Sequence, residues 1–304
     1  MKTSAFRGLL PLFGLLLSLA AGSGIAAQDS PARVTILYDA FGKNEALKQG
    51  WGYSALVEYG GKRILFDTGG HEENFAVNVK KLGVDLSRLD FVVITHRHGD
   101  HTSGLRYVLS INPSVQIYAP VESGFDRPLP PGLAKLVKRR VESAPEDMHY
   151  FDGHYPDPMT GGSLWHGAKF SHISAPTEVA PGFWLFSTLS DVTGTKEMNE
   201  ISMAIKTPRG LAVIVGCSHP GIEKILEAAT RIEPRVYSVF GGFHLVDMPD
   251  ADVSNLVLRF RDQWKFERIA AGHCTGEFAF SEFNRVYGRK FDHAAVGAVI
   301  NLPR

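Results

Sequence analysis

The sequence predicts an α/β (α+β) fold built as a layered sandwich, with sheets in the middle and helices outside. Its 304 residues are 44% hydrophobic and 21% charged, so the chain can bury a substantial core and is not disordered, collagen-like or a coiled coil. The first half opens with strands, and the second half repeats a rhythm of strand, polar loop and helix. No repeat of fixed period divides the chain, so one domain is the simpler count.

The first half is expected to begin as an antiparallel sheet. Gly60-Gly61 separates two strand-like runs and is a two-residue hairpin signal. The run from Glu72 to Lys81 has apolar residues at helical spacing, and Phe91 to Ile94 is a short buried strand that stops at a polar stretch. The three opening strands are predicted at Arg33–Tyr38, Ala55–Tyr59 and Arg63–Asp67.

The second half is expected to alternate strands with helices. A hairpin signal, Thr207-Pro208-Arg209-Gly210, joins its first two strands. The later strands are each followed by a polar loop and mostly by a helix, which places the helices outside a sheet. The strands are predicted at Ile201–Lys206, Leu211–Val215, Val236–Phe240, Arg268–Ala271 and Val296–Asn301, and the helices at Ile222–Ile232, Val253–Gln263 and Phe278–Tyr287.

The segment from Pro120 to Pro181, residues 120–181, differs from both halves. It is rich in proline and glycine and has few periodic runs, so we interpret it as a loop-rich excursion over the surface. Long loops of this kind serve as lids or carry substrate walls. The aromatic candidates for such a wall are Tyr150, Phe151, Tyr155 and Trp165. A decorated surface or a dimer contact is the alternative.

Residues 1–27 predict a secretory signal peptide. Lys2 and Arg7 precede an apolar run from Leu9 to Ala21, and small residues then lead to Ala27. The run is shorter than the roughly 20 apolar residues of a spanning helix. We therefore expect cleavage, an exported domain over residues 28–304 in the periplasm or outside the cell, and no stable membrane insertion. An uncleaved anchor is the alternative.

The charge balance argues against polyanions as partners. Lysine plus arginine equals aspartate plus glutamate, at 32 each, so no net field attracts nucleic acid. A small-molecule substrate is the expected partner. The sequence carries no signature of the oligomeric state.

A dense histidine motif follows the predicted strand that ends at Ile94. It reads His96-Arg97-His98-Gly99-Asp100-His101, that is His-x-His-x-Asp-His. In an extended segment His96 and His98 project to the same side and can bind one ion, and a turn at Gly99 lets Asp100 and His101 face a second position. Neutral imidazoles with a carboxylate suit zinc, and also iron or manganese. The motif therefore predicts one or two divalent metal ions.

Three later strand ends each carry a histidine beside glycine or cysteine. His219, His244 and His273 follow predicted strands, so they can converge with the first motif at one edge of the sheets. The two cysteines of the chain lie in the same motifs, Cys217 before His219 and Cys274 directly after His273. They either lie at the metal site or form one disulfide, and both options stay open.

Taken in order, these motifs resemble the metallo-beta-lactamase superfamily, and within it the group named for dihydropterin ribofuranosylaminobenzene phosphate synthase. Phe66-Asp67-Thr68-Gly69, His96 to His101 and His273 match the superfamily motifs. The likeness to the group is carried by Gly50-Trp51-Gly52-Tyr53-Ser54-Ala55-Leu56, Gly216-Cys217-Ser218-His219-Pro220-Gly221, Gly241-Gly242-Phe243-His244 and His273-Cys274-Thr275-Gly276. The resemblance covers most of the chain after residue 27 and implies a four-layer αββα metallo-beta-lactamase sandwich with one or two metals at its edge.

The resemblance also implies which residues bind each metal. His96 and His98 are assigned to the first metal, and Asp100 and His101 to the second. His273 completes the second site, and His219 is the candidate for the remaining histidine ligand. The chain departs from the common pattern at Cys217, where many members have a bridging aspartate. A Cys217 thiolate would favour zinc, whereas loss of the bridge would weaken the second site and could leave one metal.

Further roles follow from the same resemblance. Asp67 is expected to accept a hydrogen bond from a ligand histidine and fix its ring, with a turn cap as the alternative. Asp100 would bind metal and handle protons, and His244 is either a ligand or a group that faces the substrate, so these two are the catalytic candidates. Glu197 and Glu200 resemble an acidic element of the group, or are simply solvated.

We expect a metal-dependent hydrolase that acts on a small ester, lactone, lactam or phosphoester. A divalent ion acidifies water and polarises the attacked oxygen, and no Ser-x-x-Lys or Gly-x-Ser-x-Gly signature offers a serine nucleophile. The alternatives are a transferase that acts on a pterin-type ribofuranosyl phosphate substrate, and a non-catalytic metal-binding protein. A flavin-linked diiron reductase is excluded because the length leaves no flavodoxin-like domain.

Overall fold

The computed structural model describes residues 1, 30–122, 125, 165 and 167–304. The predicted signal peptide and most of the 120–181 excursion lie outside the described residues. None of the described helices is both long and apolar enough to cross a membrane.

The first sheet combines an antiparallel opening with parallel strands. Its strands lie in the order β14-β1-β2-β3-β4-β5-β6. β1, β2, β3 and β14 pair antiparallel, whereas β3 through β6 pair parallel. The strands span β1 Arg33–Tyr38, β2 Ser54–Tyr59, β3 Lys62–Phe66, β4 Phe91–Val93, β5 Gln116–Pro120, β6 Lys169–Ile173 and β14 Val299–Asn301.

The second sheet has a similar plan. Its strands lie in the order β13-β12-β11-β10-β9-β8-β7, antiparallel from β7 to β10 and parallel from β10 to β13. The strands span β7 Thr177–Ala180, β8 Phe183–Leu189, β9 Asn199–Thr207, β10 Gly210–Val215, β11 Val236–Gly242, β12 Arg268–Gly272 and β13 Phe291–His293.

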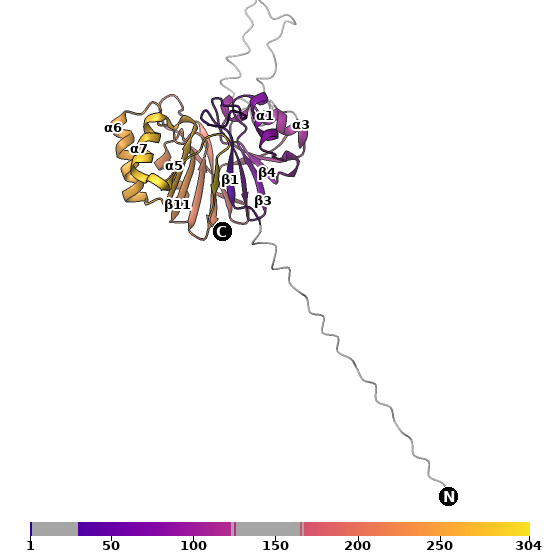
Figure 1. Cartoon of the computed structure of the whole chain (residues 1–304). Coiled ribbons are helices and arrows are strands. Elements are labelled where there is room, and N and C mark those ends of the chain that lie inside the picture. The colour runs from indigo at the N-terminus through magenta and orange to yellow at the C-terminus, as the bar shows by residue number, and fades with distance from the viewer. Residues whose placement is uncertain (2–29, 123–124, 126–164, 166) are drawn as a thin grey trace, which may run out of the picture.

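The two sheets lie face to face between two layers of helices (Figure 1). α1 (Glu72–Lys81) and α3 (Leu105–Ile111) cover the first sheet, and α5 (Ile222–Thr230), α6 (Asp250–Arg259) and α7 (Glu277–Tyr287) cover the second. Apolar side chains of both sheets, such as Ile64 and Ile214, form one buried cluster between them, and each helical layer has its own core. The predicted four-layer αββα sandwich is confirmed.

Most predicted elements are confirmed within a few residues, and the differences have local causes. The third predicted strand included Asp67, but β3 ends at Phe66 because Asp67 adopts φ 57°, a left-handed conformation that no strand contains. The predicted loop over 120–181 contains β6 and β7, and β5 and β8 were not predicted. Among the described strands β6 lies at the end of its sheet and pairs with β5 alone, and such strands depend on tertiary pairing more than on their own residues.

The registers bring several strand ends to one edge of the sandwich. Phe66 lies opposite Val93, so β3 and β4 end at the same level in the first sheet. In the second sheet Val215 lies opposite Gly241, and Gly242 lies opposite Gly272, so the ends of β10, β11 and β12 are also aligned. The predicted metal-binding motifs begin at these five strand ends.

Candidate metal centre

Asp67 organises the histidine motif of the first sheet. Its Oδ1 accepts a hydrogen bond from the Thr95 backbone N–H at 2.8 Å, and its Oδ2 accepts from the Thr95 hydroxyl at 2.8 Å. Because that hydroxyl donates its proton to Asp67, it accepts from His96 Nδ1, 2.9 Å away. His96 Nε2 is thereby left without a proton and faces His98. One carboxylate therefore fixes the tautomer of His96 through an intervening threonine.

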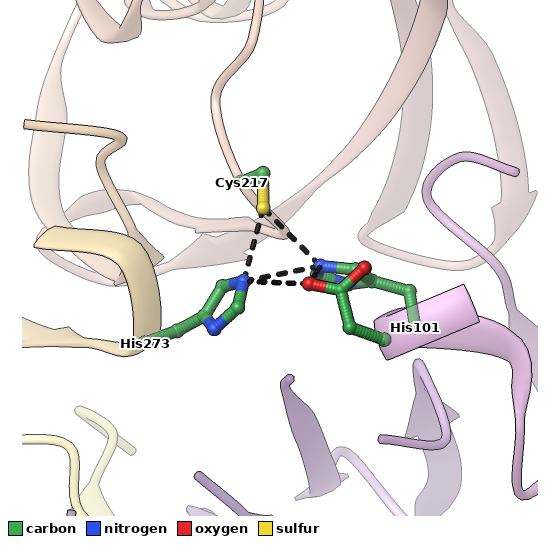
Figure 2. Close-up of side chains that lie close together, drawn as sticks. His101, Cys217 and His273 are labelled. Atoms are coloured by element: carbon green, nitrogen blue, oxygen red, sulfur yellow. Dashed lines mark hydrogen bonds and ion pairs between the residues drawn. The ribbon is translucent and has the colours of Figure 1, made fainter. Parts of the chain in front are cut away.

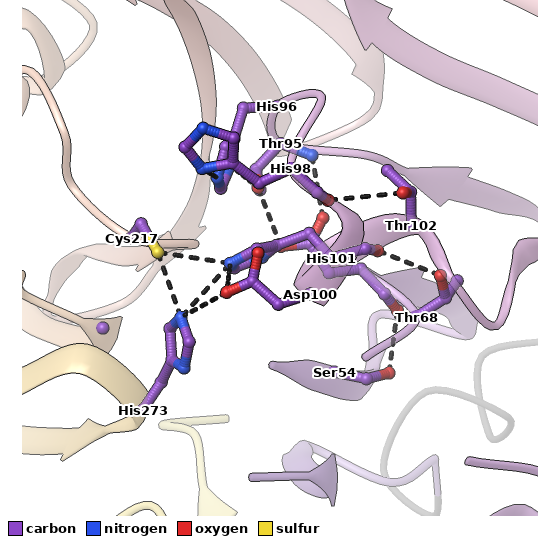
Figure 3. A network of polar contacts seen from close by, with 12 residues as sticks. Ser54, Thr68, Thr95, His96, His98, Asp100, His101, Thr102, Cys217 and His273 are labelled. Carbon is purple, nitrogen blue, oxygen red and sulfur yellow. Dashed lines mark hydrogen bonds and ion pairs between the residues drawn. The ribbon is translucent and has the colours of Figure 1, made fainter. Parts of the chain in front are cut away.

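Asp67 also orients His101 directly. The distance from His101 Nδ1 to Asp67 Oδ2 is 2.7 Å, and both side chains are fully buried. Burial lowers the pKa of His101, but the carboxylates of Asp67, Asp100 and Glu200 together outweigh burial and raise it to about 9. Thr68 N–H and its hydroxyl both donate to the His101 carbonyl, at 2.8 and 2.9 Å, so the backbone is held as well (Figure 3).

Glu200 holds the loop of the second sheet that carries Cys217 and His219. Its Oε1 accepts hydrogen bonds from the N–H groups of Cys217 at 2.9 Å and Ser218 at 2.7 Å, and its Oε2 accepts from His219 N–H at 2.8 Å. Burial raises the pKa of Glu200 to about 7, and the three backbone donors offset part of that effect. Glu200 is therefore not solvated, whereas Glu197 is exposed.

Asp39 holds the third loop, at the end of β12. Its Oδ2 accepts a hydrogen bond from His273 N–H at 2.8 Å, and its side chain is fully buried. Burial raises the pKa of Asp39 to about 8, and backbone donors from Phe41 and His273 lower it in part. Gly242 lets the loop that carries His273 pack closely against the loop that carries Cys217. A Cβ at position 242 would lie 2.6 Å from the Gly216 carbonyl oxygen and 2.9 Å from Cys274 Sγ.

These loops bring seven predicted ligands into two groups. The first donor group is His96, His98 and His219, and the second donor group is Asp100, His101, Cys217 and His273. In each group the potential ligand atoms lie within 4.8 Å of one another. In the second group, Cys217 Sγ is 3.0 Å from His273 Nε2 and 3.2 Å from His101 Nε2 (Figure 2). Asp100 Oδ2 lies 3.4 Å from His273 Nε2.

The first donor group is uncharged at neutral pH. Burial, followed by the neighbouring histidines, lowers the pKa of His96 well below its usual value. Burial, then His244 and His98, lower the pKa of His219 to about 3. Neutral imidazoles keep the lone pairs that a metal ion needs.

His219 tests whether the donor groups fit a metal. Both of its ring nitrogens are buried and have no hydrogen-bond partner among the described residues. An unsatisfied buried polar group costs about 1–3 kcal/mol, and a cation between His219, His96 and His98 would remove that cost. The residues present therefore fit a divalent metal.

His244 lies beside these groups rather than within them. Its ring centroid is 4.5 Å from that of His219, and its Nδ1 is buried without a partner in the described structure. It shares a third cluster with Cys217 and Cys274. The two sulfurs lie 3.6 Å apart, and both cysteines are free thiols in this structure.

The backbone at the site is strained. Six described residues other than glycine have positive φ, and four of them belong to the site: Asp67, Ser218, His244 and His273. Such conformations cost about 1–3 kcal/mol each and persist only where surrounding contacts hold them. The strain at these loops agrees with a functional rather than a purely structural role.

Trp165 is the one member of the proposed aromatic wall among the described residues; Tyr150, Phe151 and Tyr155 lie outside them. Its ring stacks on Phe125 with centroids 5.9 Å apart. It also lines a cavity of about 450 Å³ together with Thr102, Ser103 and Arg106, which directly follow the histidine motif. The cavity adjoins this loop but contains none of the metal-donor side chains.

Three positioning residues were not predicted as part of the site. Asp39 carried no signal, because it acts on His273 N–H, which only the fold brings near. Thr95 directly precedes the histidine motif, but its contact with Asp67 depends on the fold. Glu200 carried a weak signal, its likeness to an acidic element of the family group, and burial distinguishes it from Glu197. For Asp67, the hydrogen bond to His101 agrees with the expected orienting contact.

Comparison with known proteins supports this picture of the fold. Residues 49–273 match the family model described as the metallo-beta-lactamase superfamily. The chain is 30% identical over 290 residues to a 7,8-dihydropterin-6-methyl-4-(beta-D-ribofuranosyl)-aminobenzene-5'-phosphate synthase from Methanocaldococcus jannaschii, covering 88% of this chain and 95% of that protein. It is also 27% identical to the uncharacterized protein MJ0448 of the same organism, covering 83% and 93%.

Solved structures share the fold at lower identity. Tm1679, a metal-dependent hydrolase of the beta-lactamase superfamily, superposes with a TM-score of 0.65 at 24% identity, over 90% of this chain and all of that one. Zn²⁺-bound PqqB from Methylobacterium extorquens superposes with a TM-score of 0.52 at 16% identity, over 89% of this chain and all of that one. With its αββα sandwich and with this match over most of its length, the chain belongs to the metallo-beta-lactamase superfamily.

Proposed function

We propose that this protein is a metal-dependent hydrolase that cleaves a small ester, lactone, lactam or phosphoester. The observation that carries the proposal is the pair of adjacent donor groups at one edge of the sheets, each built from side chains that the fold holds in place. The members of both groups are buried except His98 and Asp100, which are partly exposed and give a substrate a way in.

His96, His98 and His219 would hold one divalent ion, and Asp100, His101, Cys217 and His273 would hold another. When bound, such an ion lowers the pKa of water from 15.7 to about 7 and polarises a carbonyl or phosphoryl oxygen. A thiolate among imidazoles favours zinc, with iron or manganese as alternatives.

Asp100 and His244 are the residues we assign to proton transfer. The Asp100 carboxylate is 20% exposed, so it can reach both the donor group and the substrate. His244 lies next to His219, is partly exposed, and has a buried ring nitrogen, Nδ1, without a partner in the described chain.

The test is hydrolysis of a small panel: p-nitrophenyl acetate, bis(p-nitrophenyl) phosphate, an acyl homoserine lactone and a chromogenic lactam. Protein loaded with zinc, iron or manganese should hydrolyse at least one of them, and protein stripped by a chelator should not. His98→Ala should lose both bound metal and activity. The matched control is His71→Ala, an exposed histidine that caps α1, which should keep both. Full activity of His98→Ala without metal would contradict the proposal.

The likeness to a synthase favours a second candidate, a transferase that acts on a pterin-type ribofuranosyl phosphate substrate. The two reactions differ in the role of water. Hydrolysis in ¹⁸O-labelled water places the label in the product, whereas synthesis of the compound named for the relative does not. Formation of that compound, with no labelled product from the ester panel, would favour the transferase. Metal binding with neither activity would favour a metal-binding protein.

We also propose that the protein is exported, because its first 27 residues have the pattern of a signal peptide. N-terminal sequencing of protein expressed in a bacterial host checks this. A mature start near Gln28 in the periplasmic fraction is expected, and an uncleaved start at Met1 in the cytoplasmic fraction would contradict it.

A further inference from the structure

Trp51 is an exposed aromatic residue beside the second donor group. Its surface is 54% exposed, and its ring centroid lies 5.0 Å from that of His273 at an interplanar angle of 56°. Exposing an indole to water forgoes the favourable free energy of its burial. Because the ring contacts His273, a ligand bound at the second donor group would lie within reach of it.

The backbone on either side of Trp51 is fixed to the metal-donor loop. Tyr53 N–H donates to the Asp100 carbonyl at 3.2 Å, and Gly69 N–H donates to the Tyr53 carbonyl at 2.9 Å. Gly52 adopts φ 134°, and a Cβ there would lie 2.2 Å from the Asp100 carbonyl oxygen. Such close approach positions the indole relative to Asp100, which is what a preorganised binding surface requires.

Two further exposed apolar side chains border the turn that carries His273. Val246 is 55% exposed, and its N–H donates to the Cys274 carbonyl at 3.2 Å. Phe278 is 40% exposed and lies in the first turn of α7, which begins just after that turn. Trp51, which contacts the His273 ring, is the one of these three whose side chain is in contact with a metal donor among the described residues.

We propose that Trp51 is a specificity-determining residue that binds an aryl group of the substrate against its indole ring. The position of the reacting bond at the donor groups rests on the proposed hydrolase function. An aryl group is favoured over an alkyl chain because aromatic pairs gain stability beyond the apolar area they bury. The substrate class is therefore an ester or phosphoester with an aromatic substituent near the reacting bond.

The test compares two probes that share a metal-binding headgroup, phenylphosphonate and methylphosphonate. Dissociation constants are measured by calorimetry on the zinc-loaded full chain and on Trp51→Ala, Trp51→Phe and Val299→Ala. Val299 is a matched control because it is 52% exposed and lies on β14, an edge strand. Both probes share one headgroup, so a variant that loses metal weakens both, and the ratio of their dissociation constants still reports on the ring.

Wild type is expected to bind phenylphosphonate about tenfold more tightly, equivalent to about 1.4 kcal/mol. Trp51→Ala should bring the ratio close to one, whereas Trp51→Phe and Val299→Ala should keep most of it. A ratio in Trp51→Ala equal to that of wild type would overturn the proposal, as would equal wild-type affinities. Ester hydrolysis is measured separately: a preserved ratio without turnover counts against the hydrolase alone, and turnover with a ratio of one counts against the aryl contact alone.

Discussion

The two sheets supply the metal donors in different ways. The first sheet contributes His96, His98, Asp100 and His101 from one short segment, in which Asp67 orients His96 through Thr95 and His101 directly. The second sheet contributes Cys217, His219 and His273 from separate strand ends, whose backbones Glu200 and Asp39 hold. In the first sheet one carboxylate therefore fixes side chains, and in the second two carboxylates fix loops. A defect at Asp67 should accordingly disturb side chains in both donor groups, whereas a defect at Glu200 should loosen only the one loop that carries Cys217 and His219, one member of each group.

Asp67→Ala is expected to have the largest effect. It removes the acceptor for Thr95 N–H, the Thr95 hydroxyl and His101 Nδ1 together, so buried donors lose their partner. Breaking a buried, charged network of this kind costs about 3–5 kcal/mol. We expect the free energy of unfolding, measured in urea, to fall by that amount, and bound metal, measured by elemental analysis, to fall from both donor groups.

Asp67→Asn is the control for shape. Asparagine keeps one acceptor oxygen and the size of the side chain, but its amide nitrogen only donates, so one of the two oxygens that accept from Thr95 and His101 is lost. Its metal affinity should lie between those of wild type and Asp67→Ala. Metal binding by Asp67→Asn at wild-type affinity would contradict the inference that the Asp67 carboxylate orients the donors of the first sheet.

Glu200→Gln should have a smaller effect, because it weakens the hold on one backbone loop and leaves the side-chain contacts of Asp67 in place. Glutamine keeps one carbonyl oxygen, so at least one of the three backbone N–H groups at Cys217, Ser218 and His219 loses its acceptor. Removing a partner that supports metal ligands lowers metal affinity about 10–100-fold, and we expect the lower end because part of the contact remains. Metal titration by calorimetry measures this.

The matched control is Glu197→Gln, because Glu197 is exposed and precedes Glu200 by only three residues. It should bind metal like wild type. Equal losses in both variants would show that a general change of charge, and not the loop contact, lowers the affinity.

The same difference between the sheets explains what the sequence could predict. The donor segment of the first sheet could be predicted because four donors lie within six positions. Side chains alternate along an extended chain, which places His96 and His98 on one side. The layered fold was also predictable from periodicity and hairpin signals, since β1 and α1 have the bounds expected from the sequence alone.

The supports of the second sheet were not predictable in this way. Asp39 binds His273 N–H from the other end of the chain, so no local pattern links the two residues. Glu200 differs from Glu197 only by burial, which depends on how β9 pairs with β8 and β10. The edge strands β6 and β7 were missed for the same reason, because pairing rather than residue pattern makes them strands.

Cys217→Ala and Cys274→Ala should sharpen the comparison further. Cys217 Sγ lies within 3.2 Å of two histidine nitrogens of the second donor group, whereas Cys274 belongs to neither donor group. Each replacement removes one buried sulfur, which we expect to cost on the order of 1 kcal/mol of stability. Elemental analysis should give one metal ion fewer per chain for Cys217→Ala and an unchanged count for Cys274→Ala. Equal metal content in Cys217→Ala and wild type would show that Cys217 is not a required ligand and that His101, His273 and Asp100 hold the second metal without it.

Glu282→Gln should have the smallest effect, because it removes a carboxylate far from the donor loops. Glu282 on α7 pairs with Arg285 at 2.7 Å, but Arg285 is 60% exposed and solvent screens the pair. The hydrogen bond from Arg285, then that from Ser254, lowers the pKa of Glu282 to about 2. Because the pKa of Glu282 is lower in the folded than in the unfolded state, its ionised form stabilises the fold at pH values above the unfolded-state pKa of about 4.3. This contribution is lost as the pH falls towards 2.

The expected cost of Glu282→Gln at neutral pH is therefore at most about 0.5 kcal/mol, because the exposed Arg285 leaves the pair screened by solvent, with metal content unchanged. Urea unfolding at pH 7 and at pH 3 checks both parts, since the difference from wild type should shrink at the lower pH. A loss comparable to that of Glu200→Gln would mean that any carboxylate of the sandwich contributes as much as those at the donor loops. The contrast between the site and the rest of the molecule would then fail, because it requires burial and backbone donors, and not negative charge alone, to make Asp67, Glu200 and Asp39 effective.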